Sequence, residues 1–171
     1  VALNTKKEMG SMGLCIERTV KRYPNRPAIY FEDRMLTYRE FNEEANRVAH
    51  LLVDKGVKRG DVVALFMQNR PEYLIMFTAI AKTGACAALL NNTQTGKVLA
   101  HGINLVSPVL AIVGAELAEP FNEIRKDISI ASAAIYGVSD SDTQLKPGSV
   151  PKKYKNLIKL SRDYPESNLS R

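Results

Sequence analysis

Two short polar segments follow apolar, strand-like runs of the sequence, and they hold the side chains best placed to contact a ligand. Gln68-Asn69-Arg70 comes after the apolar run 62–67, and Asn91-Asn92-Thr93 follows the apolar run 85–90. In open parallel sheets, ligands bind outside the carboxyl ends of the strands. We therefore single out Asn69 and Asn91 as candidate substrate-adjacent residues. The same side chains also suit helix caps and turns, and that structural role stays open.

The sequence lacks the common motifs of nucleotide and nucleophile chemistry. It has no GxGxxG after a predicted strand, no GxxxxGK[ST] phosphate loop and no GxSxG nucleophile elbow. His50 and His101 fall in separate predicted helices, with no carboxylate or nucleophile near His101 in the sequence. Glu43 and Glu44 are adjacent on a predicted helix, so they point about 100° apart, and we expect both to be solvated. We predict no catalytic, cofactor-binding or metal-binding residue.

Composition and length favour an ordinary globular protein. The chain has 171 residues, 45% of them hydrophobic and 25% charged, which suits one substantial domain. Cys15 and Cys86 fit no CxxC or metal-ligand spacing, so we expect small buried residues in a reducing compartment. No signal-like stretch opens the sequence, and no apolar run approaches the roughly 18 residues of a membrane span. We expect a cytoplasmic protein.

The net charge of +6 lies in the C-terminal part of the sequence. Residues 1–144 hold 17 basic and 16 acidic residues, whereas residues 145–171 hold 7 and 2. Nucleic-acid-binding domains carry basic residues over their folded body, so we expect no nucleic-acid partner. The run at 152–155, with three lysines around Tyr154, could touch anionic lipid headgroups or be merely solvated.

The first sixty residues predict a helix, a hairpin and a second helix. Apolar spacing predicts a helix over 9–22, and strands at 28–31 and 35–38 flank a turn, forming an antiparallel hairpin. Thr37 and Glu40 fit a capping box that opens the next helix. Its apolar face comprises Tyr38, Phe41, Ala45, Val48 and Leu52, and Gly56 suits its C-terminal end.

From residue 62 onward, predicted strands alternate with predicted helices. The strands are 62–67, 85–90, 109–113 and 130–136, and the helices are 71–83, 95–106 and 115–126. Asn69 and Pro71 suit the start of the first helix, and Gly84 suits its end. Apolar strands alternating with helices predict an α/β fold: a mostly parallel sheet with helices on both faces. Residues 1–136 form this unit, and 137–171 are predicted as an irregular basic linker or tail, with a short strand or helix at 152–160 and a mobile end.

Several segments resemble the opening of the adenylate-forming enzymes, which include acyl-CoA synthetases, luciferases and peptide-synthetase adenylation domains. They keep the family's order: 26–30 (RPAIY), 36–41 (LTYREF), 60–64 (GDVVA), 69–73 (NRPEY) and 82–85 (KTGA). Residues 87–91 (AALLN) and 113–117 (VGAEL) look most similar to the fatty-acid-transport-protein branch of long- and very-long-chain acyl-CoA synthetases. The resemblance covers roughly residues 10–120.

This resemblance implies part of the N-terminal domain of a fatty-acid–CoA ligase. Such enzymes join a fatty acid to ATP as an acyl-adenylate and then transfer the acyl group to coenzyme A, with Mg²⁺ as cofactor. The family's phosphate loop, ribose-binding acid and C-terminal lysine are all missing from this sequence. The resemblance therefore implies that the chain alone is inactive and binds no cofactor tightly, that it packs against the remainder of its own chain, and that it self-associates when isolated.

Three other classes stay open at this point. A non-catalytic lipid- or protein-binding α/β module would bind fatty acid without ATP. A flavodoxin-like nucleotide-binding or regulatory domain would need a phosphate loop after an early strand, for which Gln68-Asn69-Arg70 is not built. A structural interaction domain would use the basic tail on membranes.

Overall fold

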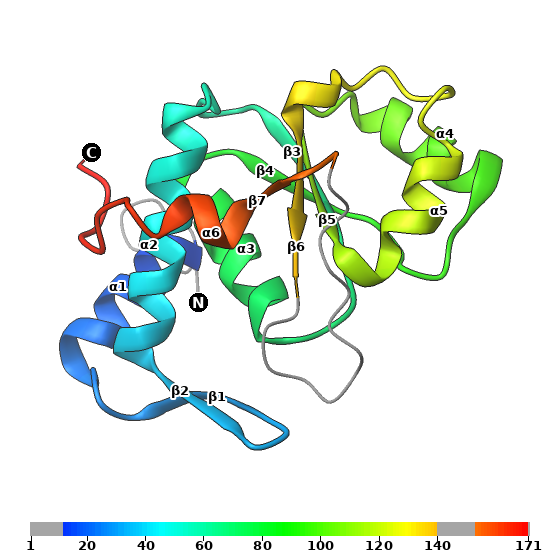
Figure 1. Ribbon diagram of the computed structural model, residues 1–171. Helices are drawn as coiled ribbons and strands as arrows, with labels where there is room; N and C mark the ends of the chain where they lie inside the picture. The colour runs from blue at the N-terminus through cyan, green and yellow to red at the C-terminus, as the bar shows by residue number, and fades with distance from the viewer. Residues whose placement is uncertain (1–11, 140–152, 171) are drawn as a thin grey trace, which may run out of the picture.

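A five-stranded parallel sheet forms the centre of the molecule (Figure 1). The structure is a computed structural model, and it describes residues 12–139 and 153–170. The strand order is β4-β3-β5-β6-β7, and every neighbouring pair is parallel. The strands are β3 (Val62–Phe66), β4 (Cys86–Leu89), β5 (Leu110–Gly114), β6 (Ile135–Val138) and β7 (Lys155–Asn156).

Helices cover both faces of this sheet, as the sequence predicts. On one face, α2 (Tyr38–Asp54), α3 (Pro71–Thr83) and α6 (Leu157–Ser161) enclose a core with side chains of β3, β5 and β6. On the other, α4 (Gly96–Val106) and α5 (Ala118–Glu123) enclose a second core, in which Phe121 contacts both Phe66 and Tyr154. The predicted α/β architecture is confirmed.

The N-terminal elements match the predicted helix, hairpin and helix. Helix α1 (Met12–Arg22) packs on α2 and α3, and β1 (Pro27–Phe31) pairs antiparallel with β2 (Arg34–Thr37). The capping box is present: the Glu40 amide donates to Thr37 Oγ1 at 3.2 Å, and the Thr37 amide donates to Glu40 Oε2 at 2.8 Å. The Thr37 amide and the Thr37 hydroxyl both donate to the Glu40 carboxylate, which stabilises its charge and lowers the pKa of Glu40.

The predicted buried strand at 85–90 is an edge strand. β4 pairs only with β3 among the described strands, and Leu89 is 49% exposed. The prediction that both cysteines are buried is also wrong, since Cys15 on α1 and Cys86 on β4 are exposed. An apolar run signals burial on average, but position in the sheet decides it, and strand order is not encoded in local spacing.

The last predicted strand is misplaced within its apolar run. Residues 130–136 were expected to be extended, but a 3₁₀ turn at Ser132–Ala134 precedes β6, which runs from Ile135 to Val138. Ile130 is nevertheless buried in the second core, so the run is apolar because it packs there and not because it is a strand. The predicted boundary between the α/β unit (1–136) and the C-terminal tail (137–171) consequently falls inside β6.

The C-terminal part differs from the irregular tail expected from its composition. Residues 140–152, including most of the predicted loop 137–151, lie outside the described residues. Beyond them, β7 joins the sheet through Tyr136 and Lys155, and α6 follows and ends one residue past the predicted range 152–160. Tyr154 and Leu157 are buried, and these two apolar anchors hold the segment on the body despite its charge.

Residues 161–170 lie along α2 and form what we call the C-terminal clasp. Asn168 Oδ1 accepts hydrogen bonds from Asn42 at 3.2 Å, Asn46 at 3.1 Å and Lys82 at 3.3 Å. Lys82 of α3 also donates to Glu17 of α1 at 2.8 Å, so Asn168 contacts α2 and α3 directly and is linked to α1 through Lys82. Further contacts pair side chains of α2 with the clasp: Arg47 with Glu166, His50 with the Ser167 carbonyl, and Asp54 with Tyr164.

Candidate functional site

The sheet changes its direction of winding between β3 and β5. From β3 the chain crosses through α3 to β4 on one side, and it then returns through α4 to β5 on the other side. In open parallel sheets the carboxyl ends of strands at such a point flank a ligand crevice. Here the flanking segments are Gln68-Asn69-Arg70, after β3, and Ala115-Glu116, after β5. This edge is the candidate functional site.

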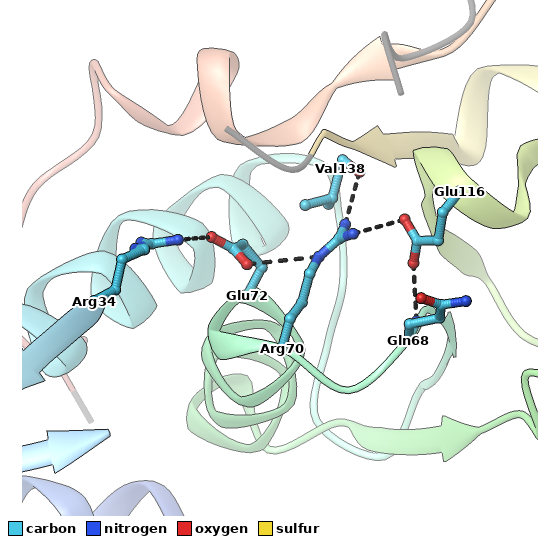
Figure 2. Close-up of polar contacts among 6 residues, drawn as sticks. All are labelled: Arg34, Gln68, Arg70, Glu72, Glu116 and Val138. Carbon is cyan, nitrogen blue, oxygen red and sulfur yellow. Dashed lines mark hydrogen bonds and ion pairs between the residues drawn. The ribbon is translucent and has the colours of Figure 1, made fainter. Parts of the chain in front are cut away.

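A chain of ion pairs occupies the edge, and we call it the carboxyl-edge cluster (Figure 2). Arg70 donates to Glu116 Oε2 at 2.7 Å and to the Val138 carbonyl at 3.1 Å, which bridges the ends of β3, β5 and β6. The backbone amide of Gln68 donates to Glu116 Oε1 at 2.9 Å. Both carboxylate oxygens of Glu116 are thus used to hold the loop after β3.

Glu72 extends the cluster to the hairpin. Its Oε2 lies 3.5 Å from Arg70 Nε, and its Oε1 accepts from Arg34 of β2 at 2.8 Å. The side chains of Arg70 and Glu72 are only 5% and 6% exposed. Removing two charges from water is costly, but each is repaid in part by a close partner of opposite sign. The cluster therefore fixes the hairpin, the start of α3 and the sheet edge relative to one another.

Gly114 makes room for the fold-back of Glu116. A Cβ atom at residue 114 would lie 2.6 Å from Glu116 Cδ, closer than real Cβ contacts occur. The backbone of Gly114 has φ −62°, so the requirement is for space and not for an unusual conformation. The small residue at 114 thus lets the Glu116 side chain fold back over the end of β5 and pair with Arg70.

Glu44 lies beside the cluster and contradicts the prediction that Glu43 and Glu44 are both solvated. Burial raises the pKa of Glu44, and the nearby Arg34 guanidinium partly offsets this by lowering it. Glu44 lines a small cavity of about 210 Å³ together with Arg34, Arg47 and Glu72. The helical spacing was right, but the folding of the hairpin and α6 over this part of α2 covers the second glutamate.

The structure brings the loops of the two candidate residues to the same edge. The Leu90 amide donates to the Leu65 carbonyl at 3.0 Å, which holds the loop after β4 beside the loop after β3. Asn69 and Asn91 are both exposed there. Asn91 Oδ1 accepts from the amide and hydroxyl of Thr93, each at 2.9 Å, so it stabilises its own turn. Contact of either asparagine with a ligand stays a prediction.

Asn69 does not cap α3 as predicted. The N-cap position is Arg70, which makes no side-chain cap hydrogen bond, while Pro71 occupies the first turn and Gly84 ends the helix with φ 79° as expected. The guanidinium of Arg70 points toward Glu116 instead. Arg70 thus occupies the N-cap position of α3, but its side chain makes a long-range contact.

The histidines do not take part in this edge. His50 of α2 contacts the Ser167 carbonyl at 2.9 Å, as part of the C-terminal clasp, and His101 is exposed on α4. Within residues 12–139 and 153–170, neither makes a hydrogen bond or an ion pair with the carboxyl-edge cluster. The absence of a catalytic role for either histidine stays a prediction.

The described side chains of this edge do not fit Mg²⁺ or a phosphate group. Residues 12–139 and 153–170 contain no group of three or more His, Cys, Asp or Glu side chains able to hold a metal. Glu72 and Glu116 are both paired with arginine, and Arg70 is buried and engaged on both sides. The arrangement can hold loops in place, and no step of adenylate chemistry is derived from it.

Sequence reasoning missed Arg70, Glu72 and Glu116 as a unit. All three stand inside segments that carry the family resemblance, yet Arg70 and Glu116 are 46 positions apart. The usable signal was a charged residue just past each of two predicted strands, together with Gly114 two positions before Glu116. Opposite charges at neighbouring strand ends are expected to pair once strand order is known.

The sequence matches the family model described as AMP-binding enzyme over residues 16–167. The chain belongs to the AMP-binding enzyme family. The resemblance to adenylate-forming enzymes is thereby confirmed, and the carboxyl-edge cluster is a feature of a member of this family. Within residues 12–139 and 153–170, no helix has the length and apolar character needed to cross a membrane.

Relatives of this AMP-binding chain include fatty-acid ligases and transport proteins. The medium/long-chain-fatty-acid–CoA ligase FadD6 of Mycobacterium tuberculosis is 37% identical over 113 residues, covering 66% of this chain and 19% of that protein. Long-chain fatty acid transport protein 6 of Mus musculus is 33% identical over 122 residues, covering 71% and 20%. The chain therefore spans about a fifth of the length of these relatives.

Two solved structures share the fold of this chain. The anthranilate CoA ligase AuaEII, in complex with anthranoyl-AMP, superposes with a TM-score of 0.79 at 22% identity, over 92% of this chain and 29% of that one. The N-terminal domain of FACL13 from Mycobacterium tuberculosis superposes with a TM-score of 0.73 at 23% identity, over 95% and 38%. At these identities the likeness shows the fold, which is that of part of an N-terminal ligase domain.

Proposed function

We propose that this chain is an N-terminal portion of a long- or very-long-chain fatty-acid–CoA ligase. The observation that carries the proposal is the family match over residues 16–167, together with relatives named as fatty-acid–CoA ligases and long-chain fatty acid transport proteins. In the whole enzyme, ATP and a fatty acid form an acyl-adenylate, and coenzyme A then displaces AMP. ATP, Mg²⁺, coenzyme A and a fatty acid are accordingly its cofactors and substrate.

The chain contributes a scaffold to that enzyme and is inactive alone. The carboxyl-edge cluster supports this role, because its charges are spent on fixing the hairpin and the loops after β3 and β5. Asn69 and Asn91 lie exposed on the ordered loops and face the ligand or the remainder of the chain. The chain thus orders one wall of a site whose reacting groups come from elsewhere in the protein.

Two measurements test this proposal together. The intact mass of the natural gene product should greatly exceed the 19.0 kDa of this chain. The natural protein should form fatty-acyl-CoA from ATP, coenzyme A and a long-chain fatty acid, whereas the 171-residue chain should give no fatty-acid-dependent exchange of pyrophosphate into ATP. A natural mass near 19.0 kDa, or tight fatty-acid binding without ATP dependence as its only activity, would favour a non-catalytic lipid- or protein-binding module.

Self-association of the isolated chain belongs to the same proposal. β4 has one described neighbour, and Leu89 on β4 and Leu74 on α3 are 49% and 38% exposed. An unpaired edge strand with exposed apolar side chains favours contact with another chain. Sedimentation of the 171-residue chain over a range of concentrations should show reversible oligomers.

We also propose a cytoplasmic protein that touches a membrane surface through its basic C-terminal segment. Lys153 and Lys155 flank the buried Tyr154, which would hold their charges at one surface of the body. Binding to vesicles with anionic headgroups should fall as salt is raised, since exposed charges are screened.

A further inference from the structure

A groove opens at the opposite edge of the sheet from the carboxyl-edge cluster. It lies where β5, β6 and β7 begin and where α2 ends, and its volume is about 340 Å³. Its walls combine apolar and polar surface, and the apolar part includes Val57, Val109, Leu110, Ala133 and Ala134. The volume is at the lower end of the range of about 300–1,000 Å³ found for small-molecule sites. We call it the amino-edge groove.

Tyr136 supplies a polar group to this groove. The residue is 2% exposed and lines the groove beside Leu110. Among residues 12–139 and 153–170, no hydrogen-bond partner is found for its hydroxyl. The ring of Tyr136 is buried but its hydroxyl is not enclosed by protein, and a hydroxyl that lines an open groove without a protein partner is suited to a ligand. Burial raises the pKa of Tyr136, so the phenol is a hydrogen-bond donor at neutral pH.

Two lysines from different elements stand at the groove. Lys55 ends α2, and Lys155 begins β7 directly beside Tyr136 in the parallel register. Asp54 accepts from Lys55 at 2.7 Å and from Tyr164 at 2.8 Å, which offsets the charge of the first lysine. In the described parts of the chain Lys155 has no ion-pair partner, so its charge is the uncompensated one.

We propose that the amino-edge groove binds a fatty carboxylate, with the acyl chain along the apolar wall and the carboxylate between the Tyr136 hydroxyl and Lys155. Apolar walls alone would accept any hydrophobic group, but an unpaired phenol donor next to an unpaired ammonium selects an anionic acceptor. The groove lies at the amino ends of the strands, so this site is separate from the ligand edge of the ligase and does not depend on the proposed function.

The test is titration of the 171-residue chain with decanoate, followed by calorimetry and by backbone amide shifts in NMR. We expect a dissociation constant of about 0.1–1 mM, consistent with a modest efficiency for a ligand of about twelve heavy atoms. The largest shifts should fall at Val57, Leu110 and Tyr136. Decyltrimethylammonium, with the same chain and opposite charge, should bind at least about tenfold more weakly, and acetate should not bind measurably.

Variants separate this site from others. Tyr136→Phe and Lys155→Gln should each weaken decanoate binding by about 3- to 10-fold, and Ala133→Phe should abolish it by filling the groove. Lys97→Gln removes an exposed lysine of α4, far from these lining residues in sequence, and should leave binding unchanged. Thermal melts of the variants establish that each is folded. Absence of decanoate binding, affinity unaffected by Tyr136→Phe and Lys155→Gln, or shifts centred on Asn69 and Asn91 would overturn the proposal.

Discussion

The carboxyl-edge cluster and the C-terminal clasp both tie distant parts of the chain to the same core, but by different chemistry. The cluster joins β2, α3 and the ends of three strands through two arginines and two glutamates, with Arg70 and Glu72 almost fully buried. The clasp joins residues 161–170 to α2 mainly through amides and peptide carbonyls, and it pairs the exposed Asn168 with the buried Asn42 and Asn46. A buried charge makes its partner indispensable, whereas water can replace part of what an exposed amide supplies to neutral groups.

The largest effect is expected from removing the centre of the cluster. Arg70→Met keeps most of the side-chain volume but leaves Glu72 facing inward with one partner lost, and it frees Glu116 and the Val138 carbonyl. Losing one member of a buried ion pair costs about 3–5 kcal/mol. Chemical denaturation of the 171-residue chain should show a loss of that size in the free energy of unfolding.

Arg39→Met is the matched control for this substitution. Arg39 is exposed in the first turn of α2, so the same change of residue type there should alter stability by no more than about 0.5 kcal/mol. If Arg70→Met were equally mild, the cluster would not be the element that holds the sheet edge, and the contrast with the clasp would fail.

A second substitution tests the cluster without removing any charge. Gly114→Ala places a methyl group against Glu116, whose Cδ would be 2.6 Å away, so the carboxylate must leave Arg70 or the backbone must shift. We expect a cost of about 1–3 kcal/mol, typical of overpacking. Gly102→Ala in α4 meets only Gln94 Oε1 at 4.0 Å and should instead stabilise by about 0.5–1 kcal/mol. Destabilisation of similar size in both variants would contradict the claim that Gly114 is required for space.

Features encoded within a few neighbouring residues could be predicted from the sequence, whereas features that depend on the assembled sheet could not. The capping box at Thr37 and the left-handed Gly84 at the end of α3 are encoded within a few residues, and both were predicted correctly. Leu89 was expected to be buried, because its apolar run says nothing of where β4 lies in the strand order.

The two polar regions were harder to predict for the same reason. Arg70 reaches Glu116 over 46 positions, and Asn42 reaches Asn168 over 126. Neither pair has a periodic or motif signal, since the contact exists only after the sheet has formed. The prediction that Asn69 and Asn91 follow strand ends at one edge of the sheet could be made because a general rule for parallel sheets fixes the position of such loops, although it does not fix what those loops bind.

The clasp should respond more weakly than the cluster. Asn168→Ala removes the acceptor shared by the buried Asn42, Asn46 and Lys82. Asn168 is itself exposed and Lys82 keeps its ion pair with Glu17, so water can replace part of what is lost. We expect a loss of about 1 kcal/mol in the free energy of unfolding. Hydrogen exchange should become faster in residues 161–170 while the central strands stay protected.

Ser167→Ala controls for this change, because it keeps the carbonyl that contacts His50 and alters only an exposed side chain. A loss for Asn168→Ala as large as that for Arg70→Met would mean that the clasp is as indispensable as the buried ions, and the comparison would have to be reversed.

The smallest effect concerns Glu44, which lies between the two regions, near Arg34 of the cluster and near Arg47 of α2, which pairs with Glu166 of the clasp. Burial raises the pKa of Glu44, so the folded chain holds this proton more firmly than the unfolded chain does. Stability is therefore lost as the pH rises from the ordinary carboxyl range through the raised pKa of the folded state. Below that interval both states are protonated, and the penalty disappears.

Glu44→Gln should remove this dependence on pH. The variant should be more stable than the natural sequence by a few tenths of a kcal/mol at neutral pH and equal to it at about pH 4. Urea midpoints at both pH values measure the difference, and Glu43→Gln removes the neighbouring carboxylate as a control for net charge. A gain that persists at low pH would show that the glutamine packs better, whereas a loss at neutral pH would show that the Glu44 carboxylate strengthens the link between cluster and clasp through its attraction to Arg34 and Arg47.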